Sequence, residues 1–348
     1  MSTLPDHNVE LIVAGTAYSG WTSVEIERAI DQMSGTFSLR LAAKERTGAK
    51  DWKIREGDEC KVMLAGVPLI TGYIDSLTRF LGPDERGIEI SGRDRTADLV
   101  DCSALNKPGS WRNRKVDEIA AELIAPFKIT LAVSGSTGAP FTKFALQQGE
   151  TVFAAIERMC RYRGLVAWSA GDGILRIGNP DSGQSIGRLA EGENVIFANR
   201  SVTVSDRFSD YVVKGQAAGS DERNGAAVAQ VQGEAKDAAI ARYRPLLIIG
   251  EEQSDRASLK KRAEWEAAVR SGQSQPVQIT VPGWLGADGK PFAHGMRADC
   301  DVPSAGISGS LLIERLRFSR DADGGTITSF DLVPPEAWTQ LAEPEPKA

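Results

Sequence analysis

Short runs in which apolar and polar residues alternate follow one another through the first hundred residues. Glycines and a polar turn at 82–87 separate these runs, which lie at Val9–Ala14, Phe37–Leu41, Cys60–Leu64, Pro68–Phe80 and Ile88–Ser91. Alternation with a period of two is typical of strands that bury one face, and short, even spacing is typical of a small barrel or sandwich. The pattern therefore predicts a first β-barrel domain over residues 1–100. The run at 21–30 is ambiguous, since it fits a strand and a helical turn equally well.

A helical period replaces the alternation in the middle of the chain. Residues 114–126 place four apolar side chains on one helical face before Pro126 stops the helix. A second helix is predicted at 151–163, with Thr151 as its N-cap and Gly164 after its last turn. Residues 165–169 and 174–177 flank a glycine turn and predict a hairpin. Together these elements predict a small α+β insert domain over residues 101–190.

Strand patterns return in the last part of the chain. The predicted strands lie at 195–198, 202–205, 210–215, 278–281, 298–302, 311–318 and 326–333. They predict a second β-barrel domain over residues 191–335, which also contains a helix at 254–271. Residues 217–230 are small, polar and aperiodic, and we expect a long mobile loop there. Residues 336–348 end in alternating Glu and Pro and predict a flexible C-terminal tail.

The two predicted β domains share a short pattern. Ile74 and Leu77 are followed by a polar turn and a strand, and Ile313 and Leu316 are followed by the same sequence of features. The identity is thin, and chance alternation of strand residues could produce it. With the strand patterns it favours two related β domains that flank the mixed insert.

Composition and charge exclude several classes of protein. The 348 residues are 41% hydrophobic and 25% charged, which is typical of a folded protein with a sizeable core. A formal net charge of −6 argues against a general nucleic-acid binder. The N-terminus has no basic and apolar signal pattern, so we expect a soluble protein that is not exported by the usual signal. The four cysteines are widely spaced, and we expect reduced core residues rather than a disulfide framework or zinc site.

The residues that usually carry catalysis are scarce in this chain. Only two histidines occur, His7 and His294, and both are predicted to be exposed turn residues. No nucleophile elbow, metalloprotease helix or phosphate-binding loop is present in the sequence, and its carboxylate pairs lie on predicted solvated helix faces. The seven tryptophans are spread over the whole chain, which favours core or interface anchors over a sugar platform. We expect a protein that is not an enzyme and has no cofactor or metal.

A charged cluster stands where the first β domain meets the insert. Five charged residues surround a small apolar patch, and they are Arg93, Asp94, Arg95, Asp98 and Asp101. One interpretation is a structural feature that also contacts a neighbouring subunit. The other is intrachain, with Asp98 or Asp101 accepting hydrogen bonds from the backbone or an Arg at the junction of strand and helix. The sequence favours the intrachain interpretation slightly, because the cluster marks a domain junction.

Several longer segments together resemble the baseplate hub proteins of Mu-like contractile phage tails. The segments are ISGRDRTADLVDCSA at 90–104, Trp111, IAAELIAPF at 119–127, GETVFAAIERMCRYRG at 149–164, WKIREGDECKVMLAGVPLITGYID at 52–75, Trp265 and VQITVPGW at 277–284. The resemblance covers nearly the whole chain and rests on overall pattern rather than on a catalytic signature. More distantly, it extends to the hub portion of type VI secretion spike proteins.

The resemblance implies a structural protein of the virion tail baseplate, assembled in the cytoplasm of a bacterial host. Members of the family form a homotrimeric ring in which each chain supplies two similar β barrels. The resulting pseudo-sixfold ring joins a sixfold tail tube protein to a threefold tail spike protein, beside other baseplate proteins, and DNA passes through its channel without specific binding. Two other classes stay open at this point: a tail-associated cell-wall hydrolase and a monomeric carbohydrate-binding β module.

Overall fold

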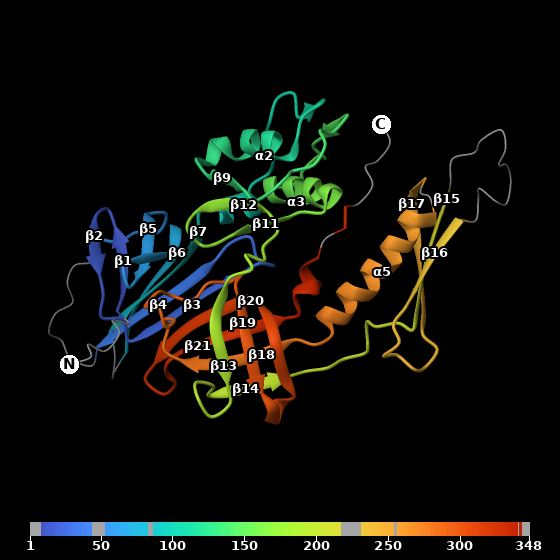
Figure 1. Ribbon diagram of the computed structural model, residues 1–348. Helices are drawn as coiled ribbons and strands as arrows, with labels where there is room; N and C mark the ends of the chain where they lie inside the picture. Colours follow the sequence, from blue (N-terminus) through green and yellow to red (C-terminus); the bar gives the residue numbers. More distant parts are fainter. Residues whose placement is uncertain are drawn as a thin grey trace.

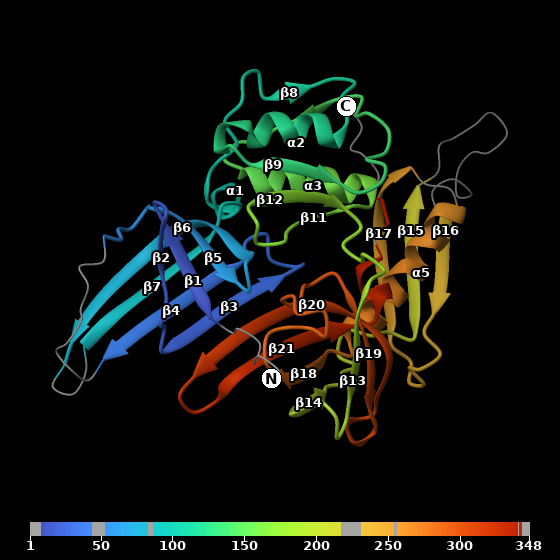
Figure 2. The same cartoon turned by 60° about the vertical axis from the view of Figure 1, so that its left-hand side comes forward.

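The protein is built mainly from strands, with a helical insert and a small lateral unit. The computed structural model describes residues 8–43, 53–82, 86–216, 231–253, 256–339 and 341–342. Figure 2 shows the N-terminal strands at the left, the C-terminal strands below, the insert above and the lateral unit at the right. The mainly β fold expected from the sequence is therefore confirmed.

One 13-stranded sheet runs through both ends of the chain. From one edge to the other its strands are ordered β14-β18-β21-β20-β3-β4-β7-β6-β5-β1-β2, and β13 and β19 branch from β20. The N-terminal strands are β1 (Val9–Val13), β2 (Thr16–Tyr18), β3 (Ser23–Ala29), β4 (Thr36–Ala43), β5 (Glu59–Leu64), β6 (Val67–Leu81) and β7 (Arg86–Asp94). The C-terminal strands are β13 (Ser185–Ala190), β14 (Phe197–Arg200), β18 (Val277–Pro282), β19 (Arg297–Val302), β20 (Ile307–Asp321) and β21 (Gly325–Val333).

The two halves of this sheet repeat one order of pairing, except that β1 and β5 are antiparallel whereas β13 and β19 are parallel. In the first half β1 pairs with β5, β5 with β6, β6 with β7, β7 with β4 and β4 with β3. In the second half β13 pairs with β19, β19 with β20, β20 with β21, β21 with β18 and β18 with β14. Both long strands have 15 residues and both following strands have 9. The pattern Ile74–Leu77 and its counterpart Ile313–Leu316 hence stand at equivalent places in the fold.

Each long strand also carries an irregularity at the same point. The register of β6 against β7 shifts between Ile74 and Ser76, and that of β20 against β21 shifts between Ile313 and Arg315. An extra residue in one strand of a pair bends it and increases its twist. Asp75 and Glu314 occupy these two bulges, which explains why an acidic residue interrupts the apolar alternation in both halves.

The two halves meet through strand pairing and share one apolar core. β3 of the first half pairs antiparallel with β20 of the second. Fully buried side chains from both halves, including Leu11, Ile26, Trp284 and Phe318, belong to one continuous cluster. Trp284 donates its indole N–H to the carbonyl oxygens of Ser319 and Ile327 at 3.2 Å and 2.9 Å, so its polar atom is satisfied inside the core.

The insert forms a separate α+β layer above the sheet (Figures 1 and 2). Its helices are α1 (Ala97–Asp101), α2 (Val116–Ile124), the 3₁₀ turn η1 (Ala125–Phe127) and α3 (Val152–Arg163). Its strands are β8 (Ser110–Trp111), β9 (Thr130–Val133), β10 (Phe144–Ala145), β11 (Val166–Ser169) and β12 (Ile174–Gly178). Thr151 accepts the Ala154 backbone N–H and Gly164 ends α3 with φ 64°, as the sequence predicted. β11 and β12 pair as the predicted hairpin.

The lateral unit differs from the sequence expectation. β15 (Asp210–Gln216), β16 (Val231–Lys236) and β17 (Pro245–Gln253) form their own three-stranded sheet, and α5 (Arg256–Gln273) covers one face of it. Tyr211, Val213, Leu259 and Ala263 form the buried centre of a cluster separate from the main core. The sequence had placed these residues in the second β domain, because an alternating strand pattern does not say which sheet a strand joins.

Three further segments complete the comparison with the sequence. Residues 202–205, predicted as a strand, follow β14 without a partner strand, although the Thr203 N–H donates to the Ser274 carbonyl at 3.0 Å. The loop expected at 217–230 lies outside the described residues. The tail predicted from 336 overlaps an ordered turn, η3 (Pro335–Trp338), whose Ala337 is buried; a further turn, η2 (Pro303–Ala305), precedes β20.

Candidate functional site at the junction of sheet and insert

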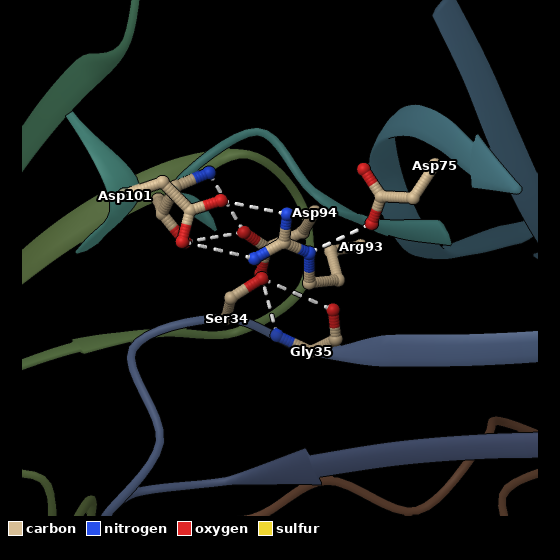
Figure 3. Close-up of polar contacts among 7 residues, drawn as sticks. Ser34, Gly35, Asp75, Arg93, Asp94 and Asp101 are labelled. Carbon is tan, nitrogen blue, oxygen red and sulfur yellow. Dashed lines mark hydrogen bonds and ion pairs between the residues drawn. The ribbon is translucent and has the colours of Figure 1, made fainter. Parts of the chain in front are cut away.

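The five charged residues singled out in the sequence occupy the end of β7 and the start of α1. Alternation along β7 turns Ile88, Ile90 and Asp94 into the protein, and Arg93 points to the other side. Figure 3 shows Arg93 between Asp75 and Asp101, with Asp94 on the side of Ser34 and Gly35. The cluster therefore divides into an outer and an inner part.

The outer part is an ion-pair network on the surface. Arg93 donates from Nε to Asp75 at 2.7 Å and from Nη2 to Asp101 at 2.8 Å. The hydrogen bonds with Asp101 and Asp75 raise the pKa of Arg93, and the hydrogen bond from Arg93 lowers the pKa of Asp101. Both carboxylates are about half exposed, at 40% and 51%, so solvent screens the network and its contribution to stability is small.

The other two charged residues lie beside this network. Arg95 pairs with Glu59 across 3.3 Å, and its guanidinium lies 5.9 Å from the ring centre of Tyr73. Asp98 is partly buried, and this burial raises its pKa. Asp75 and Glu59 were missed by sequence reasoning because they precede the cluster by many residues. Only the repeated acidic bulge position could have marked Asp75.

The inner part is the buried carboxylate of Asp94. It accepts hydrogen bonds from the Gly35 N–H at 3.0 Å, the Thr96 N–H at 2.8 Å and the Ser169 hydroxyl at 2.8 Å, and it also contacts the Thr96 hydroxyl. Burial raises the pKa of Asp94, while these hydrogen bonds act in the opposite direction. Because its partners come from the β3–β4 turn, the start of α1 and the end of β11, Asp94 joins the sheet to the insert.

Behind Asp94, a buried Arg and a buried His extend this connection to the C-terminal half. Arg28 of β3 donates to the carbonyl oxygens of Ala170 at 2.9 Å and Phe292 at 2.7 Å. His294 Nε2 lies 3.0 Å from the Ser169 carbonyl oxygen and therefore carries the proton. We call Arg28, Asp94, Ser169 and His294 the polar junction. It contacts the first half of the sheet, the insert and the second half.

The environment of His294 contradicts the sequence expectation of an exposed turn residue. Burial, together with the nearby charge of Arg28, lowers the pKa of His294 to about 3. Its ring is enclosed because β11 of the insert is packed over the 291–295 segment, a contact between residues far apart in the chain. His7 lies outside the described residues.

Most of the other candidate groups lie in the interior. Cys60, Cys160 and Cys300 are buried, Cys102 is exposed, and all four are free thiols. Across the described ranges, no three His, Cys, Asp or Glu side chains gather as metal ligands. Trp21, Trp111, Trp168 and Trp284 are buried, so these four tryptophans are core residues rather than a surface platform.

Comparison with known proteins places this architecture in a family. Residues 8–94 match the family model for the N-terminal domain of proteins that resemble GpP, a baseplate assembly protein of phage Mu. Residues 96–179 match the second domain of the gp44-like baseplate hub proteins. The chain is 30% identical to the baseplate hub protein gp44 of Escherichia phage Mu over 349 residues, which cover 98% of this chain and 91% of that protein. The chain belongs to the gp44-like baseplate hub proteins of Mu-like phages.

Two solved structures extend this assignment to the fold. The 43 kDa tail protein of prophage MuSo2 from Shewanella oneidensis is 31% identical with a TM-score of 0.86, over 96% of this chain and 100% of that one. The E. coli c3393 protein, described as a type VI secretion component similar to the T4 tail proteins gp27 and gp5, has a TM-score of 0.59 at 12% identity. The superposition covers 97% of this chain and 80% of the c3393 protein, and at this level of identity the two proteins share the fold alone.

The family assignment places the protein in the phage tail and shows where the charged cluster lies relative to the units of the family. As a baseplate hub protein the chain is a structural component of the phage tail. Helices in the described parts of the chain include none long and apolar enough to cross a membrane. The two family models meet between residues 94 and 96, within the charged cluster. The cluster thus lies at the boundary between two units of the hub family.

Proposed function

We propose that the chain forms a homotrimeric ring that adapts the sixfold symmetry of a tail tube to the threefold symmetry of a central spike. The observation that carries this proposal is the repeated strand pairing of the two halves of the sheet. Each half is one β-barrel domain, so three chains present six similar barrels. A closed cyclic ring of this kind needs one surface of each copy to meet a different surface of the next.

The partners follow from this geometry. The ring binds a tail tube protein on one side, a tail spike protein on the other, and further baseplate proteins around it, and DNA leaves through its channel. The role is mechanical, without catalysis. The likeness to a type VI secretion component described as similar to two T4 tail proteins supports a fold shared with that component.

Within the ring, the charged cluster holds the insert at a fixed angle to the sheet. Asp94 links the insert to the sheet in the interior. At the surface the link is made by the four other residues of the cluster, Arg93, Arg95, Asp98 and Asp101. The exposed carboxylates of the outer part also stand where a neighbouring subunit could pair with them. The intrachain contacts of Arg93 and Asp94 support the first role.

The mass of the full chain in solution tests the ring. Light scattering after gel filtration is expected to give about 112 kDa, three chains of 37.4 kDa each. The protein should be measured over a wide range of concentrations, since a ring with large interfaces resists dilution. A single species of 37.4 kDa at every concentration would contradict the proposal.

A further inference from the structure

The repeat in the sheet leaves one strand edge open that its counterpart fills. In the second half, residues 315–320 of β20 pair with β21 on one side and with β3 on the other. In the first half, the equivalent residues 76–81 of β6 pair with β7, and β5 reaches only as far as Tyr73. Among the described strands, the other edge of 76–81 therefore has no partner strand.

The counterpart of β3 is equally open. β14 occupies the place of β3, because β3 pairs with β4 as β14 pairs with β18. β3 pairs with β20 on its other side, whereas β14 has no second partner among the described strands. Each half of the chain thus has one unfilled position, and the two positions are complementary.

Large apolar side chains at the ends of both open edges are exposed to solvent. Ile196, Phe197 and Val202 are 60%, 51% and 58% exposed, and Leu81 at the end of β6 is 85% exposed. An exposed edge strand with large apolar side chains is a template for pairing with another chain. β6 and β14 are separated by six other strands in the sheet order and do not pair with each other within the chain.

We propose that β6 of one copy pairs antiparallel with β14 of the next copy, repeating between chains the junction that β20 and β3 form within one chain. This inference rests on the proposed ring and names its subunit contact. Three such contacts would alternate with three intrachain junctions. The sheets of six barrels would then be continuous around the ring. Neither the open edge of β6 nor the open edge of β14 would remain without a partner strand.

The intrachain junction also gives the register. We align the two halves at their bulges and follow the paired residues from strand to strand. In this alignment Arg317 is equivalent to Thr78, and Glu27 is equivalent to Ser201. Since Arg317 faces Glu27, Thr78 would face Ser201 of the next copy. In the same register the partly buried Leu77 faces Val202, which removes an exposed valine from water, and Leu81 faces Ala198.

One pair in this register is unfavourable and provides a test of it. Arg79 would lie opposite Arg200, and like charges directly opposite across strands are destabilising. The Arg200 guanidinium is engaged by the Gly306 carbonyl at 2.5 Å and the Gln275 side chain at 2.5 Å within its own chain. Replacing Arg79 by Glu should therefore increase trimer affinity severalfold, whereas a residue outside the contact should leave the affinity unchanged.

Engineered cysteines test the pairing directly. In a full chain with the exposed Cys102 changed to Ser, Thr78→Cys with Ser201→Cys should form an intermolecular disulfide under mild oxidation. Residues directly opposite in antiparallel strands have Cα atoms about 4.5–5.5 Å apart, which is within disulfide range. Covalent dimers and trimers are expected on a non-reducing gel. The matched control, Thr78→Cys with Thr203→Cys, is displaced by two residues and should cross-link at least tenfold less.

A second set of variants separates this pairing from the ring itself. Val202→Asp should shift the equilibrium at least tenfold towards monomer, whereas Val133→Asp, at a 43% exposed position in the insert, should not. A stable trimer by light scattering that gives no Thr78–Ser201 cross-link and tolerates Val202→Asp would overturn the pairing and leave the ring intact. A monomer without cross-links at any concentration would overturn both.

Discussion

At the scale of single residues, Asp94 and Asp101 show that neighbouring carboxylates in one cluster have different roles. Asp94 is enclosed and accepts hydrogen bonds from three separate segments. Asp101 is half exposed, and its carboxylate accepts hydrogen bonds from Arg93 at the surface. A buried acceptor is costly to remove because its donors are left unsatisfied, whereas an exposed ion pair contributes little.

The two residues therefore predict different losses of stability. Asp94→Ala leaves the Gly35 N–H, the Thr96 N–H and the Ser169 hydroxyl without an acceptor, and we expect the free energy of unfolding to fall by about 3–5 kcal/mol. Asp101→Ala, the matched control, should lower it by less than about 1 kcal/mol. Urea unfolding followed by circular dichroism compares the two. Equal losses would contradict the division into inner and outer parts.

Sequence reasoning found this cluster but could not assign its partners. The predicted strand ended at Ser91, whereas β7 continues to Asp94, so the sequence did not separate the inward Asp94 from the outward Arg93. Ser169, Gly35 and His294 reach Asp94 or its neighbours only through tertiary packing, and nothing in the local sequence marks them. His294 was wrongly expected in solvent because a short turn next to glycine is usually exposed, and only the packing of β11 buries it.

At the scale of elements, the lateral unit depends on a close approach between a helix and a strand. Gly233 of β16 lies against α5, and a Cβ atom at this position would be 2.1 Å from the Lys260 nitrogen and 2.2 Å from the Leu259 carbonyl carbon. Both atoms belong to helix backbone, which cannot move as a side chain can. The glycine is required here by space, not by an unusual backbone angle.

Gly233→Ala should therefore displace α5 from its sheet. Overpacking in a core costs about 1–3 kcal/mol, and the small cluster around Tyr211 and Leu259 has few other contacts to offset this loss. We expect faster hydrogen exchange throughout α5 and β15–β17, with unchanged protection in the 13-stranded sheet. The control, Gln232→Ala, alters an exposed neighbour on the same strand and should leave exchange unchanged. A uniform increase over the whole chain would show that the unit is not independent.

The same unit shows what strand patterns cannot reveal. Of its three strands the sequence predicted only β15, at 210–215, and placed it in the second β domain; β16 and β17 were not predicted as strands. The repeat between Ile74–Leu77 and Ile313–Leu316, in contrast, predicted more of the fold than its thin sequence identity suggested. Its four positions proved to mark the same bulge in two equivalent strands, because a bulge needs a specific interruption of the alternation.

At the scale of the whole molecule, the polar junction makes the relative placement of three parts sensitive to acid. Arg28 binds carbonyl oxygens of the insert and of the second half of the sheet, and His294 binds the insert through Ser169. Burial and the charge of Arg28 hold His294 neutral, with a pKa of about 3 against an ordinary value of 6.5. Protonation would place a second buried cation beside Arg28.

Stability should consequently fall as the pH is lowered from 6.5 towards 3. A histidine with a depressed pKa in the folded state contributes its full stability above the unfolded value, and loses about 1.4 kcal/mol per pH unit below it. Between pH 7 and pH 5, the wild-type chain should lose about 2 kcal/mol more than His294→Gln, whose amide can still donate to Ser169 but does not titrate. Asp94, with its raised pKa, is common to both proteins and cancels in the difference. Parallel urea stabilities of the two proteins over this range would show that His294 is not held neutral at the junction.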